Sequence, residues 1–139
     1  MSEEQAQQLM YQMQMLETYF GELAQREATL YSVLREATSA IDSIRSLKLK
    51  DDSETLVPIG MGTFVKSSIS SKEKVVLNVG AGVAIEKDSD SAINYLEARL
   101  KEIQVALQET SVKKQEAAAQ LEQGKAQINQ LMQAASQQK

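Results

Sequence analysis

The sequence contains no His, no Cys and no Trp, and only two Phe and four Tyr among its 139 residues. The absence of Cys excludes thiol catalysis and disulfides, and the absence of both Cys and His excludes the usual zinc sites. Without His, acid–base catalysis near neutral pH needs a carboxylate, Lys or Tyr with a strongly shifted pKa. We therefore predict that the protein is not an enzyme and binds no cofactor or metal.

Charge of either sign is not concentrated anywhere along the chain. The formal net charge is −4, from 19 acidic and 15 basic residues, and it divides as −2 over residues 1–50, −3 over 51–90 and +1 over 91–139. No segment is basic enough to bind a nucleic-acid backbone. No uncharged apolar run reaches the roughly 18 residues that span a bilayer, and the acidic start is unlike a secretory signal. We expect a cytoplasmic protein that contacts neither nucleic acid nor membrane.

Helix-breaking residues are confined to the middle of the sequence. The only Pro, Pro58, and four of the six Gly lie within residues 51–90, so long helices are expected only on either side. We predict one structural unit in three parts: an N-terminal coiled-coil helix over 1–50, two β-hairpins over 51–90 and a C-terminal coiled-coil helix over 91–139. Three residues are suitable N-caps for the second helix: Asp88, Asp90 and Ser91.

The two flanks carry apolar residues with a seven-residue period, which is typical of a coiled coil. In the first flank the predicted a positions are Leu9, Leu16, Leu23, Leu30, Ala37 and Ile44. Its predicted d positions are Gln12, Tyr19, Arg26, Val33, Ala40 and Leu47. In the second flank the predicted a positions are Ile93, Leu100, Leu107, Lys114, Leu121 and Ile128. Its predicted d positions are Leu96, Ile103, Thr110, Ala117, Gly124 and Leu131.

Because one chain carries both seams, we predict a long antiparallel two-helix coiled coil, mostly α, connected by the two β-hairpins. A register in which paired residue numbers sum to 140 places every predicted a position opposite a predicted d position. This register also puts Leu16 opposite Gly124 and Arg26 opposite Lys114. The half of the helix pair near the termini is therefore predicted to pack loosely.

Around residues 9–16, apolar side chains surround the first helix instead of following one stripe. The run Leu-Met-Tyr-Gln-Met-Gln-Met-Leu places them at heptad positions a, b, c, e and g, and one partner helix cannot cover them all. Met132 is predicted to lie nearby on the second helix. Because Met is flexible and polarizable, we favour a surface that binds many partners over a private interface.

Glycine-punctuated segments in the middle of the chain predict two β-hairpins. The segment 59–66 recurs twenty residues later as 79–86, and strand-like residues flank both Gly-x-Gly sequences. Neither sequence completes a phosphate-binding motif or precedes a helix, so we interpret both as turns. Pro58 cannot donate a hydrogen bond to a sheet, so its strand is predicted to be an edge.

The two predicted hairpins have no core of their own, yet their strands are rich in apolar residues. We predict that they oligomerise and bury these residues in a sheet or barrel shared among subunits. The residues are Leu56, Val57, Ile59, Phe64, Val65, Ile69, Val75, Val76, Leu77, Val79, Val83 and Ile85.

Two runs between the long helices, ETLVPIGMGTFVK at 54–66 and VGAGVAIEK at 79–87, resemble the alpha class of the archaeal-type prefoldin family. The resemblance covers essentially the whole chain, and two hairpins rather than one distinguish the alpha class from the beta class. It implies a hexamer of two alpha and four beta subunits, in which the hairpins form a double β-barrel platform that carries the coiled coils.

The resemblance further implies an ATP-independent chaperone that holds unfolded proteins and passes them to a group II chaperonin. The implied partners are prefoldin beta subunits, unfolded client proteins and the chaperonin. Client contact is then expected at the residues Leu9, Met10, Met13, Met15, Leu16, Ile128, Leu131 and Met132. A structural coiled-coil adaptor or spacer with one dedicated partner is the alternative, whereas no motif favours an enzyme.

Overall fold

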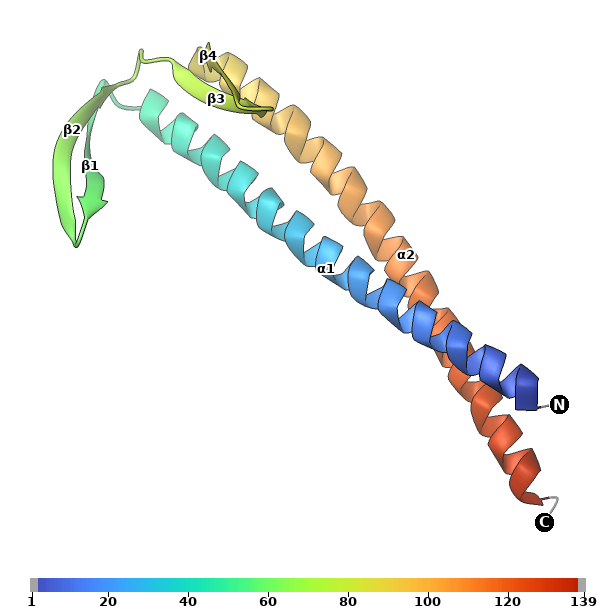
Figure 1. Cartoon of the computed structure of the whole chain (residues 1–139). Helices are drawn as coiled ribbons and strands as arrows, with labels where there is room; N and C mark the ends of the chain where they lie inside the picture. Colours follow the sequence, from blue (N-terminus) through green and yellow to red (C-terminus); the bar gives the residue numbers. More distant parts are fainter. Residues whose placement is uncertain (1–2, 138–139) are drawn as a thin grey trace. The chain divides into compact units, whose positions relative to one another are not determined.

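The computed structural model describes residues 3–137, and the ends of the predicted segments 1–50 and 91–139 at residues 1, 2, 138 and 139 lie outside this part. The elements are α1 (Glu3–Lys48), β1 (Asp52–Gly60), β2 (Thr63–Ser70), β3 (Val75–Gly80), β4 (Val83–Lys87) and α2 (Ser89–Gln137) (Figure 1). The predicted fold class, two long helices with a β-hairpin segment between them, is confirmed. Within the described residues, neither α1 nor α2 contains an apolar stretch long enough to cross a membrane.

The described chain divides into two compact units, and α1 and α2 both contribute to each of them. We call residues 33–103 the central unit, and residues 3–32 together with 104–137 the terminal unit. The central unit contains both hairpins and the helix stretches next to them in sequence. The terminal unit is a pair of helix stretches only.

In the terminal unit the two helix stretches run antiparallel. Met13 lies against Gly124, and the Lys114 Nζ is 3.0 Å from the Glu27 Oε1. A later residue of α1 thus contacts an earlier residue of α2, which is the antiparallel arrangement that the sequence predicts.

In the central unit the helices are also antiparallel, because Arg45 pairs with Glu97 (2.6 Å) and Lys48 pairs with Asp90. One cluster of apolar side chains from α1, α2 and β3 forms the core of this unit. Its buried members are Ile41, Ile44, Leu77, Ala92 and Ile93. Each large apolar side chain buried in this way contributes about 1.5–3 kcal/mol to stability.

Leu77 corrects the prediction that both hairpins lack a core and bury their strands only between subunits. Its side chain is 8% exposed and packs on the helices of its own chain, and Val75 packs against the same cluster. The reason is the alternation of side chains along a strand, which turns residues 75 and 77 of β3 to the same face. Leu77 and Val75 are therefore held largely within the chain.

The predicted seam of the second helix is confirmed position by position. All twelve of its predicted a and d residues, from Ile93 to Leu131, are buried or half-buried. The predicted a positions of the first helix are likewise buried or half-buried, from Leu9 to Ile44.

The predicted d positions of the first helix are one residue out of place over most of its length. Gln12, Tyr19, Arg26 and Val33 are exposed. The residue that follows each of them is buried or half-buried instead: Met13, Phe20, Glu27 and Leu34.

Packing decides between these two rows, because residues three and four apart both lie on one face of a helix. Lys114 lies in the seam of α2. The predicted row would place Arg26, a like charge, beside it, whereas the observed row supplies Glu27, which forms an ion pair with it. The shift therefore replaces a repulsion with an attraction.

Both hairpins form as predicted, each as a separate two-stranded antiparallel sheet. The twenty-residue repeat is visible in the backbone: Met61 and Ala81 have φ values of 50° and 54°, and the glycines that follow, Gly62 and Gly82, have 71° and 74°. Two consecutive residues with positive φ are what a tight two-residue hairpin turn requires. In both hairpins the strand pairing shifts register just before the turn.

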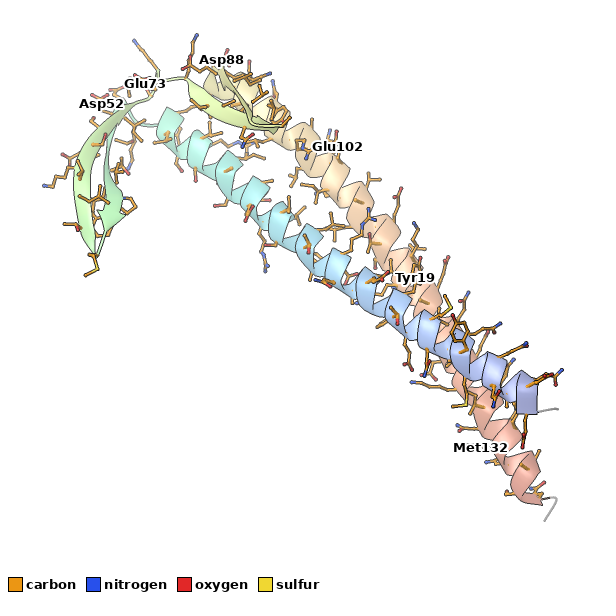
Figure 2. The ribbon with its side chains drawn as sticks, in the orientation of Figure 1. Tyr19, Asp52, Glu73, Asp88, Glu102 and Met132 are labelled. Carbon is orange, nitrogen blue, oxygen red and sulfur yellow. The ribbon has the colours of Figure 1, made fainter. Side chains whose placement is uncertain are left out.

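Asp88 lies where β4 leads into α2 (Figure 2) and, of the three predicted N-caps, is the residue that caps the helix. Its carboxylate accepts a hydrogen bond from the Ser91 backbone N–H (2.7 Å), and its carbonyl accepts one from Ala92 (2.9 Å). Hydrogen bonds from the Ser91 N–H and hydroxyl, with smaller help from the charges of Lys48 and Lys74, hold the pKa of the Asp88 carboxyl below its ordinary value of 3.8.

Replacing Asp88 by Ala should lower the melting temperature at neutral pH, because the first turn of α2 loses its acceptor. Asp88→Asn should have a much smaller effect, because the Asn side chain keeps the acceptor. A carboxyl with a lowered pKa stabilises the fold fully above pH 3.8 and loses this contribution as the pH falls through the lowered value. The difference in melting temperature between wild type and Asp88→Ala should therefore shrink on acidification, and a constant difference would contradict the assignment.

Candidate functional site

The eight residues predicted to contact clients all lie in the terminal unit, and the structure separates them by exposure. Three are strongly exposed: Met10 (57%), Met15 (58%) and Met132 (69%). Four are half-buried along the helix seam: Leu9, Leu16, Ile128 and Leu131. Figure 2 labels Met132 on α2 and Tyr19 on α1.

Met13 differs from the prediction, because its side chain is 8% exposed and belongs to the seam. Its thioether occupies the space next to Gly124, where a Cβ added to the glycine would overlap the Met13 Sδ. The sequence had placed Leu16 opposite Gly124. Met13 takes this position because the seam of α1 follows the row one residue further along.

Three tyrosines of the same unit are exposed, and two of them, Tyr11 and Tyr19, lie close in sequence to the predicted contact residues of α1. The exposure of Tyr19 differs from its predicted place in the seam, and Tyr11 is an exposed residue that the predicted contact set lacks. The sequence does carry a signal for these two residues. A Tyr side chain has an apolar ring and a polar hydroxyl, which suits a surface that is exposed to solvent in one state and bound to a partner in another.

A groove lies between residues 9–19 of α1 and residues 120–127 of α2, and we call it the terminal groove. Its volume is about 560 Å³. Its lining residues are Leu9, Gln12, Met13, Met15, Leu16, Tyr19, Gln120, Gln123, Gly124 and Gln127.

A second, smaller groove adjoins the terminal groove and shares Leu9, Gln12 and Gln127 with it. Its other lining residues are Gln5, Gln8, Gln130 and Leu131. Among the described residues, neither groove is lined by a charged side chain. The arrangement combines an apolar floor with neutral amide groups, which suits binding of apolar groups more than acid–base or electrostatic chemistry.

A polar contact fixes the seam elsewhere in the terminal unit. Lys114, besides its ion pair with Glu27, holds its Nζ 5.8 Å from the centroid of the Phe20 ring, within reach of a cation–π interaction. Both charged side chains are mostly covered. A polar pair inside a helix seam favours one register, because any slip leaves a covered charge without its partner.

The strands predicted to mediate assembly form a second candidate surface, in the central unit. The exposed apolar residues of these strands, which we call the strand surface, are Leu56, Val57, Ile59, Phe64, Val65, Val76, Val79, Val83 and Ile85. Val57 lies directly opposite Val65 across β1 and β2. Each sheet has two strands, so every strand leaves one edge unpaired by the described chain.

Ile69 is a partial exception among the predicted assembly residues. It is half-buried, and with Ser53 and Thr55 it lines a groove along the side of α1. On the first hairpin, the strand surface therefore lies on the part of β1 and β2 near the turn.

Comparison with known proteins identifies the family. The family model described as "Prefoldin subunit" matches residues 16–137. The chain is 66% identical over 137 residues to "Prefoldin subunit alpha" of Nitrosopumilus maritimus strain SCM1, covering 99% of this chain and 94% of that protein. It is 40% identical over 101 residues to the protein of the same name from Thermococcus onnurineus strain NA1, covering 71% and 69% of the two chains. The chain belongs to the prefoldin family.

Solved structures share the fold. A cryo-EM structure of filamentous PFD from Methanocaldococcus jannaschii matches with a TM-score of 0.54 and 24% identity, over 89% of this chain and 98% of that one. The crystal structure of the prefoldin beta subunit from Thermococcus strain KS-1 matches with a TM-score of 0.63 and 19% identity, over 91% of both chains.

The packing of Met13 on Gly124 can be tested by a double-mutant cycle. Gly→Ala within a helix normally stabilises it by about 1 kcal/mol. In the Met13→Ala background, Gly124→Ala should give this full gain in the free energy of unfolding measured in urea. In the wild-type background the gain should be smaller, because the new methyl group forces the Met13 side chain out of its site. Equal gains in the two backgrounds would show that the two residues do not touch.

Proposed function

We propose that the chain is a subunit of an ATP-independent chaperone that holds non-native proteins through the terminal groove and the exposed Met residues of the terminal unit. The observation that carries this proposal is the Met-rich surface left uncovered in the terminal unit: Met15 lines the uncharged groove, and Met10, Met15 and Met132 are all exposed. Membership of the prefoldin family supports the same role. The proposal assigns no catalytic step to the chain.

Flexible apolar side chains suit a protein that must bind many sequences. Met has three rotatable bonds and a polarizable sulfur, so it adapts to partners of different shape, whereas branched side chains hold one shape. A single small groove gives weak binding because few contacts oppose the loss of motional freedom. Weak binding at one site is compatible with release without ATP.

Assembly supplies the strength that one site lacks. We propose that the strand surface is covered by other prefoldin subunits, in a complex of two alpha and four beta chains. Several grooves on one platform make successive contacts with a client intramolecular, which raises avidity by about 10²–10⁴. The unpaired strand edges and the exposed pair Val57 and Val65 support this use of the hairpins.

Transfer of a client then requires only competition for each weak contact in turn. A second binder that takes over these contacts one after another releases the client without nucleotide hydrolysis. We propose that a group II chaperonin in the cytoplasm is this acceptor.

The client-binding surface can be tested by light scattering of a denatured protein diluted into the assembled complex. Replacing Met10, Met15 and Met132 by Ser should increase aggregation of the client, because the uncovered apolar area is reduced. The matched control is Val105→Ser with Val112→Ser, since these two α2 residues are also exposed and apolar but lie about 30 Å or more along the helix from Met132, at 1.5 Å per residue.

Unchanged protection by the Met variant, or equal loss in the Val variant, would refute the assignment of the surface. Protection of one client only, with no effect on unrelated denatured proteins, would favour the adaptor with a single dedicated partner.

Assembly through the strand surface can be tested by native mass, with the chain alone and co-expressed with a prefoldin beta subunit. Replacing Val57 and Val65 by Lys should abolish the larger species, because burying two lysines without partners is costly. Val105→Lys with Val112→Lys adds the same charge on α2 and should leave the mass unchanged. A wild-type chain that stays monomeric under both conditions would refute assembly.

A further inference from the structure

The rim of the terminal groove is made of glutamines. Gln12 from α1 and Gln120, Gln123 and Gln127 from α2 line it, and all four side chains are exposed. We propose that the groove binds an extended, uncharged segment of polypeptide by pairing these amides with the backbone of the segment, while its floor receives an apolar side chain. The inference rests on the proposed function and specifies what part of a client the groove recognises.

The floor of the groove determines what enters it. Met13 is buried, Leu9 and Leu16 are half-buried, and Met15 and Tyr19 stand exposed at its side. A groove of about 560 Å³ lies within the range of sites that hold small apolar groups with a few polar contacts. Gly124 carries no side chain, and the Met13 side chain occupies the space that one would take.

The rim determines what is recognised beyond apolarity. A Gln side chain carries a carbonyl acceptor and an NH₂ donor, which are the same two groups that each peptide unit presents. In a folded protein nearly all buried backbone groups are already paired, whereas an extended segment of a non-native chain leaves them free. An amide rim therefore favours non-native over folded protein, and a purely apolar surface lacks this selectivity.

The absence of charge restricts the occupant further. Within residues 3–137, no Asp, Glu, Lys or Arg lines the terminal groove or the smaller groove next to it. A charged peptide finds no opposite charge there and would lose hydration on entry. Binding of an uncharged segment through amides should also be insensitive to ionic strength, because salt screens charges and leaves neutral hydrogen bonds unaffected.

The test uses the full chain in the assembly in which it purifies, and two labelled peptides followed by fluorescence anisotropy. The first probe is a short capped peptide of Ser, Thr and Leu with a central Leu. The second has the same side chains, but ester bonds replace the amides on both sides of the central Leu. The ester removes a backbone donor and weakens a carbonyl acceptor while the apolar side chain is retained.

The amide peptide should bind roughly tenfold more tightly than the ester peptide, as expected for two net hydrogen bonds of ordinary strength. Equal binding of the two peptides by the unaltered protein would overturn the inference without any mutation. Preference for a peptide of the same length with added Lys or Glu, or a strong salt dependence, would also overturn it.

A protein variant provides the second arm. Gln12→Met, Gln123→Met and Gln127→Met together keep the length of the side chains and remove the amides. Amide-peptide binding should weaken roughly tenfold, whereas ester-peptide binding should not fall. The matched control is Gln104→Met, Gln108→Met and Gln115→Met, because these exposed α2 glutamines line neither groove.

The sign of the effect separates the mechanisms. If apolar contact alone drives binding, as for a lipid chain or a detergent, three added Met side chains strengthen binding of both probes, and the inference is wrong. If the peptide test fails but the Met10, Met15 and Met132 variant still protects the client less than the wild type does, the inference is wrong and the proposed function stands. Unchanged protection in that variant would refute the proposed function whatever the peptides show.

Discussion

One helix can cover only a single stripe of another, and most of the terminal unit follows from this constraint. In a two-helix pair, each helix buries the residues of its seam and leaves every other side chain to solvent or to another molecule. Where the seam residues are the only apolar ones, such a pair is complete. Where apolar residues surround the helix, as over residues 9–16, the pair necessarily leaves part of them uncovered, and that remainder is the candidate binding surface.

The central unit meets the same problem differently, because a third element is present there. Leu77 of β3 packs into the cluster of Ile41, Ile44 and Ile93, so one hairpin contributes to the core of its own chain. The turn end of the other hairpin stays exposed. The described residues thus leave two apolar surfaces of different kinds uncovered, a flexible Met-rich one on helices and a β-branched and aromatic one on strands.

Much of this arrangement was accessible from the sequence, and the one systematic error is informative. The positions of glycine and proline predicted where the hairpins lie, and the seven-residue period predicted every seam residue of α2. In α1 the row that contains Gln12 and Arg26 and the row that contains Met13 and Glu27 are nearly equal in apolar content. Only the residues that face them decide between the rows, and a single helix does not contain that information.

By itself the sequence determined the elements, the antiparallel pairing and the surplus of apolar residues, because these depend on local propensity, on periodicity and on composition. The tertiary structure decided which surplus residues stay exposed. Gly124 leaves room for Met13 but not for a further side chain, and Lys114 attracts Glu27, so packing and charge across the seam rotate the covered stripe by one residue. That rotation buries Met13, exposes Tyr19 and leaves the glutamines at the rim of an open groove.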